Sequence, residues 1–334
     1  MINCNFLKNK SILITGGTGS FGKKFAASLL NNFKDIKRLV IFSRDELKQY
    51  ELSKKYPTSK YDFIRYFIGD IRDKDRLKRA IENIDYVIHA AALKQVDTAE
   101  YNPGEYIKTN VIGSNNIVEA CLENNVKKVI ALSTDKACSP VNLYGATKLC
   151  SEKIFLAANN IKGKRNIIFT VVRYGNVAGS RGSIIPKILE AKANNSKYFN
   201  LTHNKATRFW ITLEESVDMV LWAIKNSHQG QLLVPKIPSF KISDLINVLY
   251  PKCKIKITGL RPGEKIHEDL VSINETNLYD IGKFYSIYPS YLNSKISLLK
   301  NKKVSDNFMM NSGTYKQNLT FKDLIEKTKL LKNI

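Results

Sequence analysis

Residues 11–22 read SILITGGTGSFG: a short apolar run, Ser11–Thr15, is followed by glycines at positions 16, 19 and 22. The apolar run predicts a buried β-strand, and the amphipathic stretch Phe21–Leu30 predicts a helix directly after the glycines. A strand, a glycine-rich turn and a helix N-terminus suit a pyrophosphate, because the backbone can approach the phosphates closely and the helix dipole favours their charge. Gly16, Gly19 and Gly22 are therefore candidate dinucleotide contacts; the structural alternative is a glycine turn at a sheet edge.

The same alternation of strand and helix continues through the first half of the chain. Further strands are predicted at Arg38–Phe42, Phe63–Ile68, Tyr86–His89, Lys128–Leu132 and Ile167–Arg173, and helices at Asp45–Lys55, Lys74–Glu82 and Glu105–Asn124. This spacing predicts an α/β fold with a doubly wound parallel sheet. Beyond residue 176 the pattern loosens, with a loop at Gly179, Gly182 and Pro186 and less periodic segments at Asn194–Arg208 and Pro235–Leu249. We expect residues 1–176 to form the dinucleotide-binding domain, with strand contributions from later residues, and residues 177–334 to form mainly a substrate-binding region.

Composition narrows the class of protein. With 334 residues, 43% hydrophobic and 25% charged, the chain has a globular composition. It contains no apolar run long enough to span a membrane and no signal-peptide pattern at its start, so we expect no membrane association. Its five cysteines form no CxxC pair, which favours reduced thiols in the cytoplasm over a disulfide frame or a metal site. The net charge of +23 comes from scattered lysines without interleaved aromatics, so no nucleic-acid partner is expected.

The end of the second predicted strand indicates the cofactor. A site for NAD places an acidic residue there, whereas Ser43 and Arg44 lead here. We therefore expect NADP, with the Arg44 guanidinium bonding two oxygens of the 2′-phosphate. Asp45 or Glu46 could instead cap the next helix. Asp70, after the third strand, is placed to accept from an adenine amino group, or else to stabilise a turn.

The segment YGATK places Tyr144 and Lys148 four residues apart, and hence on one helix face. A tyrosine hydroxyl can take a proton from an alcohol during hydride transfer if a neighbouring ammonium stabilises its phenolate. Residues 133–136, read STDK, follow the fifth strand and are expected to meet that pair above the sheet. Together they predict an oxidoreductive site; the alternative is an ordinary exposed helix face.

Several longer motifs carry a family resemblance. TGGTGSFG, HAAALK, STDKA, YGATK and RYGNVAGSRGS resemble the extended short-chain dehydrogenase/reductase superfamily, whose fold is of the Rossmann type. SRDELKQ, AEYNP, STDKACSPVNLYGATKL, TRFWIT, VPKIPS and RPGEKIHE resemble the inverting UDP-N-acetylglucosamine 4,6-dehydratases of the pseudaminic acid pathway, over roughly residues 10–273. The chain departs from that pattern at Gln95, Asp97 and Ala206.

The resemblance implies a set of site residues. Those implied for NADP are Gly16, Thr18, Gly19, Ser20, Phe21, Gly22, Ser43, Arg44, Asp45, Glu46, Leu47, Lys48, Asp70, Ile71, Ala90, Lys94, Tyr144, Lys148 and Val177. Those implied for a UDP-sugar substrate are Lys94, Asn176, Ile184, Arg208, Arg261 and Glu264. Those implied for catalysis are Thr134, Asp135, Lys136 and Tyr144. A homo-oligomer is implied as well.

The implied reaction oxidises C4 of the sugar, removes water across C5–C6 and returns hydride to C6, as the first step of pseudaminic acid synthesis for glycan or flagellin modification. Relatives that retain the configuration at C5 carry Asp-Glu, with Glu as the C5 base, where this chain has Asp135-Lys136. A different base permits protonation of the other face of C5, so Lys136 predicts inversion. A lysine serves as a base only if its neutral form is accessible. The structural alternative for Lys136 is an ion pair with Asp135, which we do not expect of adjacent residues. Alternative functions are a retaining 4,6-dehydratase or 4-epimerase of another UDP-sugar, and a non-catalytic NADP-binding regulator.

Overall fold

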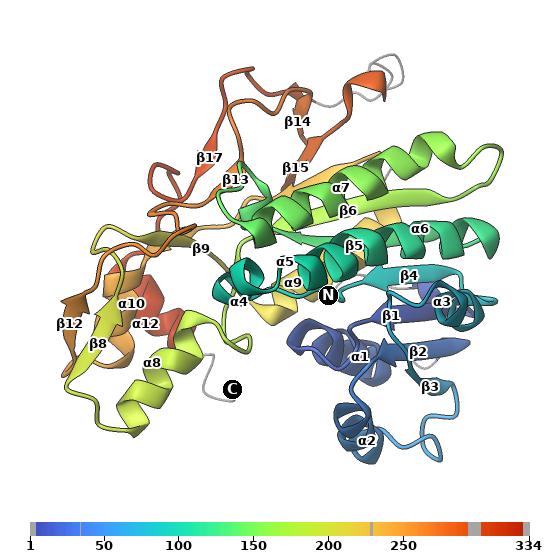
Figure 1. Cartoon of the computed structure of the whole chain (residues 1–334), viewed down its shortest axis with the longest axis horizontal. Helices are drawn as coiled ribbons and strands as arrows, with labels where there is room; N and C mark the ends of the chain where they lie inside the picture. The colour runs from blue at the N-terminus through green and yellow to red at the C-terminus, as the bar shows by residue number, and fades with distance from the viewer. Residues whose placement is uncertain (1–4, 34, 228–229, 293–301, 330–334) are drawn as a thin grey trace.

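The computed structural model describes residues 5–33, 35–227, 230–292 and 302–329. Its centre is one sheet of ten strands in the order β16-β14-β15-β10-β6-β5-β4-β1-β2-β3 (Figure 1). The parallel strands are β1 (Ser11–Thr15), β2 (Arg38–Ser43), β3 (Ile64–Ile68), β4 (Tyr86–His89), β5 (Lys128–Thr134), β6 (Ile168–Tyr174) and β10 (Leu232–Pro235). The order 3-2-1-4-5-6 is that of dinucleotide-binding sheets, and it confirms the predicted doubly wound α/β fold.

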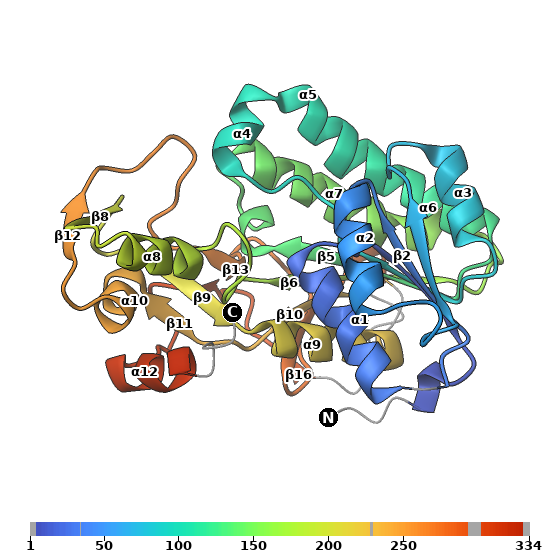
Figure 2. The same cartoon turned by 90° about the horizontal axis from the view of Figure 1, so that it is seen from below.

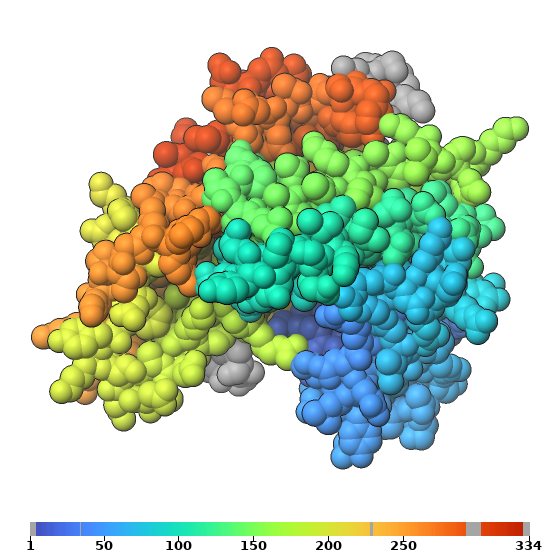
Figure 3. Space-filling view, viewed as in Figure 1, coloured from blue at the N-terminus to red at the C-terminus, as the bar shows by residue number. Residues whose placement is uncertain are grey.

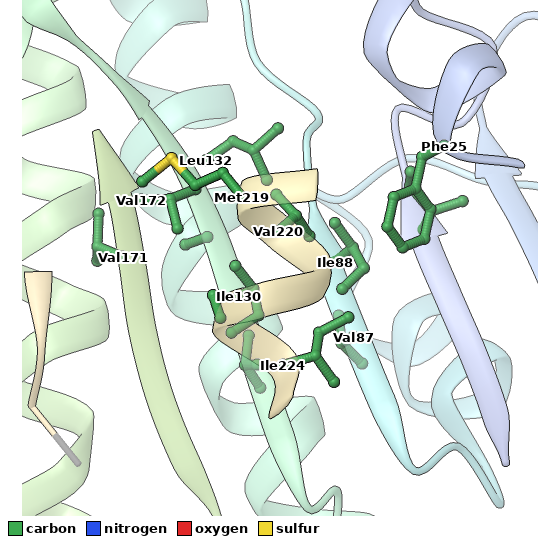
Figure 4. Packing of buried hydrophobic residues seen from close by; sticks show 14 of the residues in the cluster. Phe25, Val87, Ile88, Ile130, Leu132, Val171, Val172, Met219, Val220 and Ile224 are labelled. Atoms are coloured by element: carbon green, nitrogen blue, oxygen red, sulfur yellow. The ribbon is translucent and has the colours of Figure 1, made fainter. Parts of the chain in front are cut away.

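Helices cover both faces of this sheet. α1 (Ser20–Asn32) packs beside α9 (Leu213–Asn226), and α6 (Gly113–Glu123) packs between α3 (Lys74–Ile81) and α7 (Leu143–Ile161) on the opposite face (Figure 2). α2 (Glu46–Lys55) connects β2 to β3. Met219, Val220 and Ile224 of α9 point at the apolar strand residues below them (Figure 4). Since both faces are covered, the central strands are mostly apolar, and every residue of β1 is buried.

Residues after 176 extend the sheet beyond β6. β10 is parallel to β6, and it then pairs antiparallel with β15 (Phe284–Ile287). β14 (Leu278–Asp280) and β16 (Lys302–Lys303) complete this edge, also antiparallel. The large sheet is therefore built by both halves of the sequence.

The remaining elements form a second lobe beside the sheet (Figure 1). Its strands are β7 (Asn176–Val177), β8 (Tyr198–Leu201), β9 (Thr207–Ile211), β11 (Ser239–Lys241) and β12 (Lys254–Ile257), and its helices are α8 (Ile184–Ala193), α10 (Ile242–Leu249) and α12 (Phe321–Lys329). This lobe has its own apolar core, in which Trp210, Phe240 and Leu324 are buried. A short pair, β13 (Asp269–Val271) with β17 (Met310–Asn311), lies between this lobe and the sheet.

One prediction about secondary structure needs correction. The helix expected over Glu105–Asn124 is α5 (Pro103–Tyr106), a π-helical turn η2 (Ile107–Ile112) and then α6; α4 (Val96–Tyr101) precedes them. The side chain of Asn110, within the π-helical turn, bonds both backbone groups of Leu93 and the Thr147 hydroxyl, contacts that periodicity does not encode.

The segments described as less periodic, Asn194–Arg208 and Pro235–Leu249, hold β8, the start of β9, β11 and α10. Short 3-10 turns occur at η1 (Asn5–Leu7), η3 (Asp135–Ala137) and η4 (Ser290–Leu292). No helix in the described ranges is long and apolar enough to cross a bilayer. The described cysteines, Cys121, Cys138, Cys150 and Cys253, are unpaired, and Cys4 lies outside the described residues.

Candidate active site

A cavity of about 760 Å³ lies between the carboxyl ends of the parallel strands and the second lobe. Figure 3 shows a hollow on this face, between the yellow-green lobe and the blue N-terminal units. The predicted site residues that line the cavity are Gly16, Gly19, Ser20, Phe21, Gly22, Ala90, Lys94, Thr134, Asp135, Lys136, Tyr144, Lys148, Asn176, Val177, Ile184, Arg208, Arg261 and Glu264. The other predicted contacts are Thr18 in the glycine-rich turn, Ser43 at the end of β2, and the residues that follow β2 and β3: Arg44, Asp45, Glu46, Leu47, Lys48, Asp70 and Ile71.

The glycine-rich turn brings bare backbone to the cavity wall. Gly16 has φ +65°, and a Cβ there would lie 2.8 Å from the Ala91 nitrogen. Gly19 is the N-cap of α1, so the first amides of that helix face the same space. A helix N-terminus whose cap residue is a glycine fits a pyrophosphate. The residues present therefore suit a dinucleotide.

The groups that follow β2 and β3 differ in what they already bind. Asp45 caps α2 by accepting from the Lys48 amide at 2.9 Å, as the structural interpretation of that residue expects, and it also pairs with the Lys48 ammonium. Asp70 accepts from the Arg72 backbone amide and guanidinium, both at 2.9 Å. Arg44 lies 3.6 Å from Asp70, and its side chain stays half exposed. Its guanidinium therefore keeps donors available for a ligand.

Tyr144 and Lys148 reach the cavity from the first turns of α7. The Asn142 side chain caps this helix by accepting from the Gly145 amide at 2.8 Å. A Cβ on Gly145 would lie only 2.2 Å from the Lys136 carbonyl oxygen, so glycine lets the helix pack directly on the Asp135–Ala137 turn. This packing places the tyrosine beside the residues that follow β5.

Burial shifts the Tyr144 hydroxyl and the Lys148 amine toward their neutral forms. It raises the pKa of Tyr144 to about 12, against the opposing effects of the Lys136 charge and a hydrogen bond with Thr134. Burial lowers the pKa of Lys148 to about 8, with Glu152 acting in the opposite direction. The Lys148 ammonium donates to the Leu132 carbonyl at 2.7 Å, which fixes its position at the end of β5.

Lys136 lies between two buried carboxylates. Its Nζ is 3.1 Å from Asp135 Oδ1 and 3.1 Å from Glu268 Oε1. The ion pair with Asp135, which we did not expect of adjacent residues, forms because the 3-10 turn at Asp135–Ala137 folds the two side chains together. Burial disfavours the ammonium, but the two carboxylates outweigh it and raise the pKa of Lys136.

Arg208 of β9 lies next to Lys136 and its two carboxylates. Its Nε lies 3.7 Å from Glu268 Oε1. Its Nη atoms donate to the carbonyls of Thr207, Ile266 and Lys265, at 2.7, 3.0 and 3.2 Å. Most donors of Arg208 therefore hold the segment that carries Glu268.

Charged residues also cluster at the outer end of the cavity. Arg261 bonds Asp97, one of the departures from the family pattern, at 2.9 Å, and it also pairs with Glu264. Lys94 donates to the Arg181 carbonyl at 2.9 Å. Arg181 in turn donates to Ser20 Oγ and to the Thr18 carbonyl, both at 3.2 Å, so its loop lies against the glycine-rich turn.

Among the cavity residues that were not singled out from the sequence are Arg181 and Glu268. Arg181 lies within the 177–184 loop, and Glu268 is the last residue of RPGEKIHE, so the signal for each was its motif. Four buried oxygens of cavity residues lack a hydrogen-bond partner within the described chain: Asp135 Oδ2, Asn176 Oδ1, Ser183 Oγ and Glu268 Oε2. Unsatisfied buried polar atoms in a cavity are what a polar ligand would complete.

Comparisons with known proteins agree with this geometry. Residues 12–289 match the family described as polysaccharide biosynthesis protein. The chain is 50% identical over 326 residues to a UDP-N-acetylglucosamine 4,6-dehydratase (inverting) of Campylobacter jejuni, covering 95% of this chain and 96% of that protein. It is 43% identical over 286 residues to a UDP-glucose 4-epimerase of Rickettsia bellii, covering 84% and 83%. The X-ray structure of Pen from Bacillus thuringiensis superposes with a TM-score of 0.87 at 35% identity, covering 97% of this chain and 99% of that one.

Proposed function

The chain belongs to the polysaccharide biosynthesis protein family, and from that premise we propose that it is an inverting UDP-N-acetylglucosamine 4,6-dehydratase. Its product would be UDP-2-acetamido-2,6-dideoxy-β-L-arabino-hex-4-ulose. The observation that carries the proposal is the placement of the Asp135–Lys136 pair in one cavity with Tyr144 and Lys148. Hydride transfer at C4 needs only Tyr144 and Lys148, whereas loss of water across C5–C6 needs a further acid and base.

Each residue has a distinct role in this reaction. Tyr144 takes the proton of the C4 hydroxyl, and the positive charges of Lys136 and Lys148 favour its phenolate. Thr134 hydrogen-bonds Tyr144 and donates to Asp135 Oδ1 at 2.9 Å, so it joins the two halves of the site. Asp135 takes a proton from the Lys136 ammonium, which lies 3.1 Å away, and gives it to the departing C6 hydroxyl, so Lys136 is left as the neutral amine. Lys136 removes the C5 proton and later returns one to the opposite face, which inverts C5.

We propose NADP as the cofactor, held by the glycine-rich turn and α1 with Arg44 at the 2′-phosphate. When bound, it supplies the hydride acceptor for C4 and the hydride donor for C6. Lys94, Asn176, Ile184, Arg208, Arg261 and Glu264 stay our proposed contacts of the UDP-sugar. The unpaired cysteines support a cytoplasmic location. We further propose a homo-oligomer, for which light scattering of the purified protein is the measurement.

The alternative function is a UDP-sugar 4-epimerase, the activity named for the Rickettsia bellii relative. An epimerase returns hydride to C4 and leaves C5 and C6 untouched, so it has no use for a buried acid–base pair beside the tyrosine. The presence of Asp135 and Lys136 in the cavity therefore favours dehydration.

Product analysis distinguishes these activities. The purified protein is incubated with UDP-N-acetylglucosamine in deuterated water, and the sugar is followed by NMR. We expect a 4-keto-6-deoxy sugar with the L-arabino configuration and deuterium at C5. Conversion to the C4 epimer would establish the epimerase instead. A D-xylo product would overturn the inversion, and unchanged substrate in the presence of bound cofactor would overturn the function.

A further inference from the structure

Asp97, one of the departures from the family pattern, forms an ion pair across the outer end of the cavity. It lies in the first turn of α4 and lines the cavity. Its Oδ2 is 2.9 Å from Nη1 of Arg261, which lies in the loop between β12 and β13. Arg261 is one of the proposed contacts of the UDP-sugar. The Asp97 carboxylate therefore occupies a cation that the diphosphate of the ligand would use.

Arg261 does not depend on Asp97 for its orientation. The Glu264 carboxylate accepts from Arg261 Nε at 2.9 Å and from the Arg261 backbone amide at 3.2 Å, and it also bonds Nη2. The side chain of Glu264 is 15% exposed, whereas that of Asp97 is 69% exposed. Because an exposed ion pair contributes little, the better buried carboxylate of Glu264 sets where the guanidinium points.

The backbone on both sides of this ion pair is also anchored elsewhere, at the start of α7. The Asn142 side chain donates to the Gly263 carbonyl at 2.8 Å, which holds the loop that carries the arginine. The Glu100 carboxylate accepts from the Leu143 amide at 2.9 Å, which holds α4 against the same turn. The ion pair is therefore not needed to keep the loop and α4 together.

What Asp97 adds to the cavity is negative charge. Nη1 of Arg261 is the guanidinium nitrogen without a bond to Glu264, and Asp97 already bonds it. A diphosphate that binds Nη1 must displace this carboxylate or tolerate its charge close by. We propose that Asp97 competes with the diphosphate of the nucleotide-sugar for Arg261, and so lowers the affinity of the cavity for UDP ligands; this rests on the proposed function.

A competing carboxylate acts on the product as well as on the substrate. The proposed reaction changes only C4, C5 and C6 of the sugar, so both molecules carry the same UDP group. Each contact with UDP that aids capture of the substrate therefore also slows release of the product. The exposed pair between Asp97 and Arg261 breaks at little cost, so UDP still binds, yet the returning carboxylate helps the product to leave.

The test is the binding of UDP to Asp97→Asn, measured by titration calorimetry beside the wild type. Asparagine keeps the shape of the side chain and can still accept from Arg261, but it carries no charge. We expect Kd for UDP to fall about fivefold at low salt, in line with the strength of an exposed ion pair. The difference should shrink below about twofold in about 0.5 M salt, because exposed charges are screened. KM for UDP-N-acetylglucosamine should fall as well.

The matched control is Asp306→Asn. Asp306 pairs with Lys303 at 2.9 Å, and this pair has the same distance and the same exposed fractions, 69% for the aspartate and 52% for the cation, as the pair of Asp97 with Arg261. Asp306 is not one of the described residues that line the cavity. D306N should therefore bind UDP as the wild type does. A gain equal to that of D97N would show that net charge sets the affinity, and it would overturn the proposal.

Arg261→Gln completes a double-mutant cycle, which isolates the interaction of the two side chains. If Asp97 acts through Arg261, D97N should change Kd for UDP by less than about twofold in the R261Q background. An equal gain in both backgrounds, or weaker binding of UDP by D97N alone, would overturn the proposal; weaker binding would mean that Asp97 orients the arginine. Failure of the wild type to convert UDP-N-acetylglucosamine, with the gain in D97N intact, would instead overturn the function and leave the competition for Arg261 standing.

Discussion

Tyr144, Lys148 and Lys136 show how burial and charge act on single residues. Burial is the main effect at Tyr144 and Lys148 and favours their neutral forms: the pKa of Tyr144 is raised to about 12 and that of Lys148 is lowered to about 8. At Lys136 the two adjacent carboxylates reverse that effect and preserve the charge. The free enzyme therefore keeps a cation beside a neutral tyrosine, and that charge favours loss of the Tyr144 proton, so that the phenolate can accept the proton of the C4 hydroxyl.

Lys136→Ala tests the assignment of the C5 base. The variant should fold and bind NADP, because Lys136 is not among the proposed contacts of the cofactor. Without a positioned base the ketone at C4 should keep its C5 proton, and kcat should fall about 10²–10⁴-fold. The measurements are NADP binding by thermal shift and deuterium at C5 by NMR. Turnover near the wild-type rate would show that another group removes this proton.

Arg44→Ala tests the choice of cofactor. The half-exposed guanidinium keeps donors free beside Asp70, and a 2′-phosphate would use them. The variant should therefore lose affinity for NADP more than for NAD, measured by titration calorimetry with both. Arg38→Ala at the start of β2, whose Nη1 bonds the Glu82 carbonyl, is the matched control and should bind both as the wild type does. Equal losses for the two cofactors in R44A would remove Arg44 from 2′-phosphate recognition.

At the scale of elements, Arg173 of β6 joins three segments. It is 1% exposed, and it bonds Glu152 of α7 at 2.6 Å and Glu275, before β14, at 2.8 Å. The Ser133 hydroxyl also donates to Glu152, at 2.5 Å. Since α7 carries Tyr144 and Lys148, this buried group sets where the helix lies over the strand ends.

Replacing Arg173 by Met should therefore be severe. It leaves the buried Glu152 and the partly exposed Glu275 without their cation, which costs about 3–5 kcal/mol of unfolding free energy. Urea denaturation of the purified variant measures this loss. Lys74→Met, which breaks the exposed pairs with Glu119 and Glu123, is the control and should cost below about 1 kcal/mol. Similar losses in the two variants would show that the Arg173 bridge is not what holds α7.

The elements that sequence predicts well are those whose signal is local. β1 to β6 read as apolar runs because both faces of a parallel sheet are covered, and the helices between them follow from spacing. The π-helical turn was missed since it depends on where Asn110 bonds in three dimensions. Glu268 was missed for the same reason: its contact with Lys136 joins segments far apart in the chain. Motifs indicated which residues belong to the site, and only the fold indicated which of them touch.

At the scale of the whole molecule, the cavity lies between two lobes with separate cores. The proposed reaction removes hydride from C4 and returns it to C6 of the same sugar. We therefore expect no net change in absorbance at 340 nm during steady turnover of UDP-N-acetylglucosamine, with product measured in parallel by NMR. A stoichiometric rise in absorbance would show a simple dehydrogenase instead.

The pairing of β13 with β17 bears on when the enzyme becomes active. Ser312, beside β17, fixes the backbone of Glu268, and Leu324 of α12 is buried in the second core. A nascent chain leaves the ribosome N-terminus first, so the dinucleotide-binding strands emerge long before either residue. A half-made chain can thus acquire its nucleotide-binding fold while the lysine that starts dehydration still lacks its fixed carboxylate partner. If the proposed function holds, we expect dehydration only after the segment that carries Ser312 has been made.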